Sequence, residues 1–324
     1  VEKYSQKEAS LDILVNNAGI VWQDPIDDFP EEGWQLFRSR NINTDNILVE
    51  AGSTFRWGGK YSDDYSTRDT LFTELGVFEN FSPTIQEADR LSPLVFLGNI
   101  HPDLQSSVAK LTPSAEYIVT DTMNLWIDLF PEKLKEVLKL STILLINNEE
   151  AEQYTGQSEI SNAAGELLSA GPEIVVIKKG ADGACLARGE NRHSVPVFPI
   201  NQVIDPTGAG DSFAGGFMGA LSQAGQPDFL EAVIVGSAMA SFCVEGFGVE
   251  SLLQATPTLL AHRVKTIKKS ITDLVTDLVK EEYSLSVRAA NTISLLDDVT
   301  QDPNMPSYVR TQLWQAVSKL ESIR

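Results

Sequence analysis

The sequence predicts an α/β protein built on a doubly wound, mostly parallel central sheet. Apolar segments alternate with helical segments between Leu94 and Lys179, and this alternation is typical of a parallel sheet with helices on both faces. The expected strands are apolar throughout, as they are when both faces of a sheet are covered. Polar residues stand where three of these strands end, at Asn99, Asp121 and Asn147. Ligands bind at that edge of such sheets.

The expected elements follow one another in a regular order along the chain. We expect strands at 94–100, 116–122, 142–147 and 173–179, and helices at 104–111, 131–140 and 161–170. A hairpin is expected to pair 184–188 with 194–198, and two further helices follow residue 211, the second over 229–244. The second helix is rich in small residues, which lets it approach its neighbour closely.

Composition limits the classes of function. The chain has 324 residues and a formal net charge of -20, so binding to nucleic acid or to an anionic membrane is not expected, because both need a positive surface. The two cysteines and three histidines show no metal-binding spacing. With no signal peptide and no membrane-spanning run, a cytoplasmic location is expected.

The most informative stretch is Asp-Pro-Thr-Gly-Ala-Gly-Asp at 205–211. A glycine-rich turn that opens a helix leaves backbone N–H groups unpaired, and the helix dipole adds positive potential. Such a turn binds anions, most often phosphate. Asp211 would repel a bound phosphate unless it serves as the base for an incoming hydroxyl. The alternative is that Asp211 only caps the helix.

This stretch resembles the C-terminal signature of the ribokinase-like (PfkB) carbohydrate kinases, and the Ser-Phe-Ala-Gly-Gly-Phe run that follows also fits. The resemblance implies a ribokinase-like fold and an ATP-dependent kinase. It also implies that Asp211 is the catalytic base and that the amides of Gly208, Ala209 and Gly210 form an anion hole for the transferred phosphoryl group.

A second segment, Asn147 to Glu150, resembles the Asn-x-x-Glu motif of the same family. The resemblance implies that Asn147 and Glu150 help to place Mg²⁺ and phosphate, largely through water. Mg²⁺ prefers oxygen ligands and keeps several waters, which suits these residue types. The alternative is a helix start whose first-turn acids interact favourably with the helix dipole.

Further residues are assigned to the nucleotide by the same resemblance. Gly180 and Gly183 match a Gly-x-x-Gly turn that borders the nucleotide, and the helix at 229–244 flanks the adenine. The full set of cofactor-binding residues implied in this way, beyond Asn147 and Glu150, is Lys179, Gly180, Gly183, Asp205, Thr207, Ser237 and Ala240. A plain hairpin turn and ordinary core packing are the alternatives for the glycines and for the helix residues.

A small β-lid is implied over about residues 47–82. The segment from Thr54 to Tyr61 is short, aromatic and rich in glycine, and a further strand is expected over 71–81. Since lid strands cover the acceptor in this family, Arg56 and Lys60 are implied to touch it. A solvated edge strand protected by its charges is the alternative. Asn99 and Asp121 are the acceptor-side residues at the edge of the sheet.

The first 27 residues have a different character. Asp-Ile-Leu-Val-Asn-Asn-Ala-Gly at 12–19 resembles a strand of the short-chain dehydrogenases, and we expect it to supply one strand. Neither the acidic sugar-binding residue nor the Gly-Gly motif of the ribokinase-like enzymes is found. We therefore expect a kinase domain over 28–265 that lacks the family's N-terminal strands, with part of the acceptor pocket missing.

Residues 266–324 read as an appended helical extension. The segment contains no glycine and carries apolar stripes at helical spacing. It resembles a small uncharacterised archaeal helical family. An amphipathic helical cap or an oligomerisation element fits this pattern, so the sequence allows a homodimer formed through the lid or the C-terminal helices.

The function that we expect from these features is transfer of the γ-phosphoryl group of ATP to a hydroxyl of a sugar or nucleoside, with ATP and Mg²⁺ as cofactors. The alternative is a catalytically impaired, truncated kinase that acts as a nucleotide-binding or interaction protein. A third hypothesis, an oxidoreductase, rests on the dehydrogenase-like segment alone.

Overall fold

We describe a computed structural model of the chain, and the description covers residues 13–16, 35, 38–39, 42–44, 47, 51–53, 56–61, 68–223 and 225–279. The chain divides into two compact units. The first contains residues 1–53 and 80–268, and the second contains residues 54–79 and 269–324.

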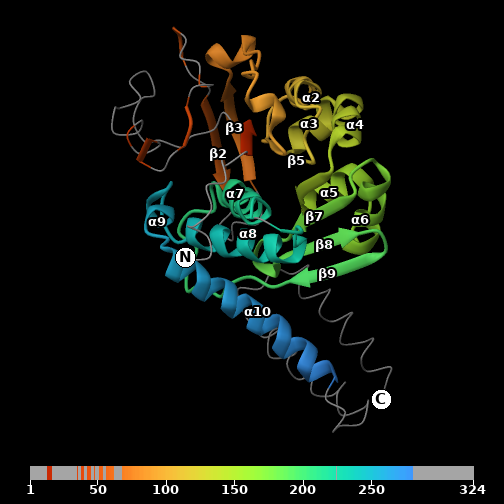
Figure 1. Cartoon of the computed structure of the whole chain (residues 1–324), viewed down its shortest axis with the longest axis vertical. Helices are drawn as coiled ribbons and strands as arrows, with labels where there is room; N and C mark the ends of the chain where they lie inside the picture. Colours follow the sequence, from red (N-terminus) through yellow and green to blue (C-terminus); the bar gives the residue numbers. More distant parts are fainter. Residues whose placement is uncertain are drawn as a thin grey trace. The chain divides into compact units, whose positions relative to one another are not determined.

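The first unit is organised around a sheet that has seven strands among the described residues (Figure 1). Its order is β1-β4-β5-β6-β7-β8-β9. The strands are β1 (Ile13–Asn16), β4 (Leu94–Leu97), β5 (Tyr117–Asp121), β6 (Ile143–Asn147), β7 (Ile174–Lys178), β8 (Ala184–Arg188) and β9 (Asn191–Val195). The pairs from β1 to β7 are parallel, and β8 and β9 add an antiparallel hairpin. The predicted doubly wound, mostly parallel sheet is therefore confirmed.

Two details of the sheet bear on the sequence predictions. The dehydrogenase-like segment does supply a strand: β1 pairs in parallel with β4, with Ile13 opposite Leu94 and Asn16 opposite Leu97. The second hairpin strand was expected over 194–198 but spans 191–195. The turn is tighter than expected because Gly189 adopts a positive φ of 53° directly after β8.

The described residues also form helices. They are α2 (Pro102–Leu111), α3 (Asn124–Leu129), α4 (Pro131–Leu140), α5 (Asn148–Thr155), α6 (Ile160–Ser169), α7 (Ala209–Leu221), α8 (Phe229–Cys243), α9 (Glu250–Leu253) and α10 (Pro257–Val279). Short 3-10 helices among the described residues lie at Gly76–Asn80, Asp89–Leu91 and Gly180–Asp182. In the described part of the chain, no helix combines the length and apolar character needed to cross a membrane.

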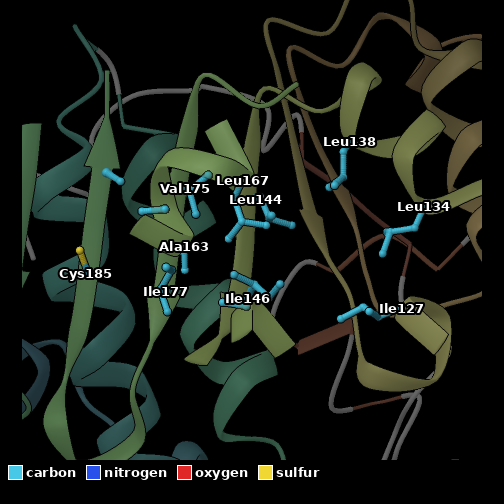
Figure 2. Close-up of a cluster of buried hydrophobic side chains, with 13 residues drawn as sticks. Ile127, Leu134, Leu138, Leu144, Ile146, Ala163, Leu167, Val175, Ile177 and Cys185 are labelled. Atoms are coloured by element: carbon cyan, nitrogen blue, oxygen red, sulfur yellow. The ribbon is translucent and has the colours of Figure 1, made fainter. Parts of the chain in front are cut away.

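One face of the sheet packs against α3 to α6. Figure 2 shows its core, where Leu144 and Ile146 of β6 and Val175 and Ile177 of β7 meet Leu167 and other apolar side chains of the helices. The alternate residues of the same strands are just as deeply buried, so they face the opposite side, where α7 and α8 lie (Figure 1). Two buried faces explain why the strands are apolar throughout.

Helices α7 and α8 cross in close contact. A Cβ atom on Gly216 of α7 would lie 2.8 Å from Met239 Cγ, 2.9 Å from the Val235 carbonyl oxygen and 3.0 Å from Gly236 Cα. A Cβ atom on Gly236 would lie 2.8 Å from the Phe213 carbonyl oxygen. The small residues of α8 therefore allow the close approach that the sequence predicts.

The second unit contains a two-stranded antiparallel ribbon formed by β2 (Arg56–Tyr61) and β3 (Arg68–Glu74). A second strand was expected over 71–81, but it ends at Glu74, and Gly76–Asn80 form a 3-10 helix instead. Gly76 has a φ of 56°, which interrupts an extended strand. The register shifts between Gly58 and Gly59, and a Cβ atom on Gly58 would overlap the Phe72 ring at 2.3 Å.

Helix α10 belongs to the first unit as far as Lys268. This part of the helix is fixed by Arg263, which donates to Ser241 Oγ at 2.7 Å and to the Glu245 carboxylate. The Arg263 guanidinium also lies 3.6 Å from the centre of the Phe242 ring. The apolar stripes predicted between residues 293 and 320 lie outside the described residues.

Candidate active site

The carboxyl ends of three adjacent strands place Asp121, Asn147 and Lys178 at one edge of the sheet. Asn147 of β6 is level with Lys178 of β7, and Asp121 of β5 is level with Leu145 of β6. Since β6 lies between β5 and β7, the long Lys178 side chain reaches across β6 to Asp121. Its Nζ donates to Asp121 Oδ1 at 3.1 Å.

The Lys178–Asp121 pair is largely shielded from solvent, with exposed side-chain fractions of 16% and 10%. Burial acts to lower the pKa of Lys178, but the Asp121 carboxylate, with further contributions from Glu150 and Asp211, raises it above the usual value. The ammonium group therefore remains charged through the neutral range. Because Asp121, Glu150 and Asp211 all act on Lys178, the fold brings these four charged groups together.

Asn147 and Glu150 form a reciprocal cap at the start of α5. Asn147 Oδ1 accepts from the Glu150 N–H at 2.8 Å, and Glu150 Oε2 accepts from the Asn147 N–H at 3.1 Å. Both residues therefore fulfil the helix-start alternative. No group of three acidic, histidine or cysteine side chains suited to a metal occurs within the described ranges. The amide oxygen of Asn147 and the carboxylate of Glu150 are ligand types that suit a Mg²⁺ ion whose other ligands are mainly phosphates and water.

The turn before α7 is held by its own backbone and by α8. Asp205 Oδ1 accepts from the Thr207 N–H at 2.9 Å. Gly208 is the N-cap residue of α7, with a φ of 81° and no side-chain cap. The Cys243 thiol of α8 donates to the Thr207 carbonyl oxygen at 3.3 Å, and the Val244 carbonyl accepts from the Ile204 N–H at 2.8 Å.

The first turn of α7 lies at a helix N-terminus, which is a common place for anions to bind. The Ala209 N–H bonds to the Pro206 carbonyl oxygen at 3.2 Å, and the Ser212 N–H bonds to the Gly208 carbonyl oxygen at 2.8 Å. Gly210 lies between them in the first turn, where an α-helix itself supplies no carbonyl partner for the N–H groups. Lys178 lies against this turn, because a Cβ atom on Gly210 would be 3.5 Å from Lys178 Nζ. The site therefore combines helix amides, one buried ammonium group and Asp211.

The Gly-x-x-Gly turn at 180–183 is explained in part by packing. Gly183 has a φ of 84°, and a Cβ atom there would overlap the Val195 carbonyl oxygen at 2.0 Å. The Lys179 N–H bonds to the Gly183 carbonyl oxygen at 2.7 Å. Gly180 also has a positive φ, but a Cβ atom there would meet nothing within 4 Å. The hairpin-turn alternative thus accounts for Gly183, whereas Gly180 borders open space.

The charge of Lys179 acts on Asp182 and Cys185. Burial raises the pKa of Asp182, and the charge of Lys179 opposes that rise. Ser237 and Ala240 lie within α8, where Ser237 is buried and Ala240 is half-buried. Core packing therefore accounts for Ser237.

Asn99 is already engaged at the acceptor-side edge. Its Oδ1 accepts from Trp126 Nε1 at 2.7 Å, and its Nδ2 donates to Met123 Sδ at 3.2 Å. Trp126 in turn packs edge-on to His101, with ring centres 5.4 Å apart. These contacts fix the start of α3 beside the end of β4.

Arg56 and Lys60 both lie on β2, in the second unit. Arg56 is paired within the ribbon: its Nη1 donates to Glu74 Oε2 at 3.0 Å, and its guanidinium lies 5.6 Å from the centre of the Phe72 ring. Its side chain is 61% exposed, as the charged edge-strand alternative predicts.

Sequence reasoning missed Lys178 and Gln105. Gln105 is fully buried, and its Nε2 donates to the carbonyl oxygens of Gly98 at 2.9 Å and Asp121 at 2.8 Å. It thereby joins the ends of β4 and β5. Gln105 could have been found because it is a polar residue within the apolar face of α2. Lys178 could have been found because it is the last residue of an apolar strand.

Comparison with known proteins agrees with this architecture. Residues 70–256 match the pfkB family carbohydrate kinase model, and residues 262–323 match an uncharacterised protein family, UPF0147. A cytidine kinase of Thermococcus kodakarensis is 28% identical over 205 residues, which are 62% of this chain and 72% of that protein. A UPF0147 protein of Aeropyrum pernix is 45% identical over 60 residues, which are 18% of this chain and 66% of that protein.

Among solved structures, aminoimidazole riboside kinase from Salmonella enterica, complexed with aminoimidazole riboside and an ATP analogue, superposes with a TM-score of 0.57. The two share 20% identity, and the match covers 78% of this chain and 84% of that chain. The fold and the glycine turn at the sheet edge thus define a ribokinase-like α/β protein. The chain belongs to the pfkB carbohydrate kinase family, and its C-terminal segment belongs to UPF0147.

Proposed function

We propose that the protein transfers the γ-phosphoryl group of ATP to a hydroxyl group of a nucleoside or sugar. The observation that carries the proposal is the position of Asp211 at the first turn of α7, next to the amides of 208–210 and within the electrostatic reach of Lys178. A base, an anion site and a cation are the groups that phosphoryl transfer requires.

In the proposed reaction, the acceptor hydroxyl oxygen forms a bond to the γ-phosphorus as the bond from that phosphorus to the bridging oxygen of ADP breaks. The electron pair of the broken bond leaves with ADP, and Asp211 takes the hydroxyl proton. The amides of Gly208, Ala209 and Gly210 stabilise the charge on the transferred group. Asn147 and Glu150 would hold Mg²⁺ through water, and the ion would neutralise part of the triphosphate charge.

The acceptor class proposed here follows from the relatives. The cytidine kinase of Thermococcus kodakarensis is 28% identical to this chain over 205 residues, so cytidine is the first acceptor to test. Ribose and purine nucleosides complete the panel, because the family resemblance covers both sugar and nucleoside acceptors.

The test is release of ADP from Mg²⁺ and ATP in the presence of each acceptor. Asp211→Asn keeps the size of the side chain but removes the base, so turnover is expected to fall about 10²-fold to 10⁴-fold, while ATP binding is retained. Glu136→Gln, which removes an exposed carboxylate on α4, serves as the control and should keep full activity. An active Asp211→Asn protein would refute the assignment of the base, and ATP binding without transfer to any acceptor would favour a nucleotide-binding protein.

A further inference from the structure

We infer that Lys178 binds the terminal phosphoryl group of ATP at the glycine turn, and that Asp121 holds the lysine in position for this contact. The inference rests on the proposed function, because it assigns a ligand to a residue of the same site. It gives Lys178 a direct part in substrate binding and gives Asp121 a positioning role in addition to its place at the acceptor side.

The first reason is geometric. Lys178 Nζ lies so near the turn that a Cβ atom on Gly210 would be 3.5 Å away, which is an ordinary van der Waals contact. A phosphoryl group bound by the amides of this turn would therefore meet the ammonium group. The absence of a side chain at residue 210 leaves that approach open.

The second reason is the capacity of the ammonium group. A lysine ammonium offers three N–H donors, and the contact with Asp121 Oδ1 at 3.1 Å occupies one of them. The remaining hydrogens can reach a second oxygen ligand while the first contact is kept. Asp121 is itself fixed, because Gln105 Nε2 donates to its carbonyl oxygen at 2.8 Å.

The third reason is charge. Asp121, Glu150 and Asp211 surround Lys178 and all raise its pKa. A triphosphate that enters beside three carboxylates is repelled unless cations compensate, and Mg²⁺ supplies only part of that compensation. Lys178 adds a fixed positive charge at the turn itself, whereas the neighbouring Lys179 acts on Asp182.

An alternative is that Lys178 only neutralises Asp121 and touches no ligand. The two roles differ in a double variant. If Lys178 serves only Asp121, then removal of both charges in Lys178→Met/Asp121→Asn restores the site. If Lys178 binds phosphate, the double variant stays defective. This variant also leaves neither member of the Lys178–Asp121 ion pair buried without the other, so it tests the inference even if Lys178→Met alone does not fold.

The experiment is calorimetric titration of the full-length chain with ATP and with ADP in the presence of Mg²⁺, with thermal melting as the check on folding. We expect Lys178→Met and the double variant to bind ATP about 10-fold to 100-fold more weakly, as loss of a hydrogen bond to a charged group implies. Binding of ADP, which lacks the terminal group, should change far less. Lys110→Met, at an exposed lysine of α2, should leave both affinities unchanged.

Three results would overturn the inference, and they differ in what they imply for the proposed kinase function. If the unmodified protein binds ATP and the folded lysine variants bind it equally well, the phosphate-binding role of Lys178 is refuted, but the proposed kinase function is not affected. If the unmodified protein binds no ATP, both the role of Lys178 and the proposed kinase function are refuted. Recovery of ATP affinity in the double variant would assign Lys178 to Asp121 alone.

Discussion

Replacement of Gly216 by alanine tests the packing on which the site is built. Alanine is ordinarily the better helix residue, by as much as about 1 kcal/mol relative to glycine. At Gly216 the added Cβ atom would lie 2.8–3.0 Å from three atoms, and two of them, the Val235 carbonyl oxygen and Gly236 Cα, belong to the backbone of α8. The side chain of Met239 can rotate away, but the backbone cannot move without separating the two helices.

The expected magnitude follows from these opposing terms. Overpacking of a core costs about 1–3 kcal/mol, which exceeds the gain in helix propensity. Gly219→Ala in the same helix is the matched control, because a Cβ atom there meets nothing within 4 Å. It should gain up to about 1 kcal/mol. The gain in helix propensity is common to both variants, which have the same composition, so they should differ in unfolding free energy by the overpacking cost of about 1–3 kcal/mol, or about 2 °C or more in melting temperature.

The assay is thermal and urea-induced unfolding of both variants beside the unmodified protein, followed by circular dichroism. Equal stability of the two variants, or a more stable Gly216→Ala protein, would refute the close crossing of α7 and α8. Because α7 begins with the glycine turn, Gly216→Ala should also lower turnover in the proposed kinase reaction.

Three further predictions concern stability and reactivity. Arg263→Ala should lower the unfolding free energy by about 2–3 kcal/mol, because the guanidinium is hydrogen-bonded to Ser241 and stacked on the Phe242 ring. Urea unfolding measures this loss. An effect no larger than that of Lys265→Ala, at an exposed lysine of the same helix, would contradict the prediction. Burial lowers the pKa of His101, so the unfolded state binds more protons, and stability should be complete above the unfolded value of about 6.5 and fall as the pH drops below it. His101→Asn keeps a capping acceptor without titrating and should flatten that dependence between pH 5 and 7.5; an unchanged slope would exclude His101 as its source. Burial raises the pKa of both cysteine thiols, so neither should react with a thiol reagent at pH 7.5 until denaturant is added, and rapid reaction of the native protein would contradict the buried positions.

The fold could be predicted from sequence because its signals are local. An apolar run followed by a helical segment identifies each β-α unit without knowledge of its neighbours. The prediction failed where a single glycine changed the outcome: Gly189 shortened the hairpin turn, and Gly76 ended β3. A positive φ is a property of the backbone in three dimensions, and the sequence shows only that glycine allows it.

The candidate site was predicted less completely because it depends on the order of strands. Lys178 and Lys179 are adjacent in sequence, but Lys178 is the last residue of β7 and Lys179 is the cap of the 3-10 helix that follows. Which of them reaches Asp121 depends on β5, β6 and β7 lying side by side, with Asn147 level with Lys178. No local pattern contains that register, so Lys179 was assigned to the nucleotide and Lys178 was overlooked.

Substitutions at Gly180 and Gly183 test different things: the fold requires glycine at position 183, whereas position 180 can report on ligand binding. Replacement of Gly183 would force a Cβ atom into the Val195 carbonyl oxygen, so loss of activity in such a variant would report on folding. Gly180 borders open space, and alanine there meets only the modest cost of a positive φ, of the order of 1 kcal/mol. A ligand that approaches this turn would meet the new methyl group at Gly180, whereas the fold would not. Gly180→Ala is therefore the informative substitution: weaker ATP binding in a folded Gly180→Ala protein would place the nucleotide against the turn, and unchanged binding would leave the motif with its hairpin role alone.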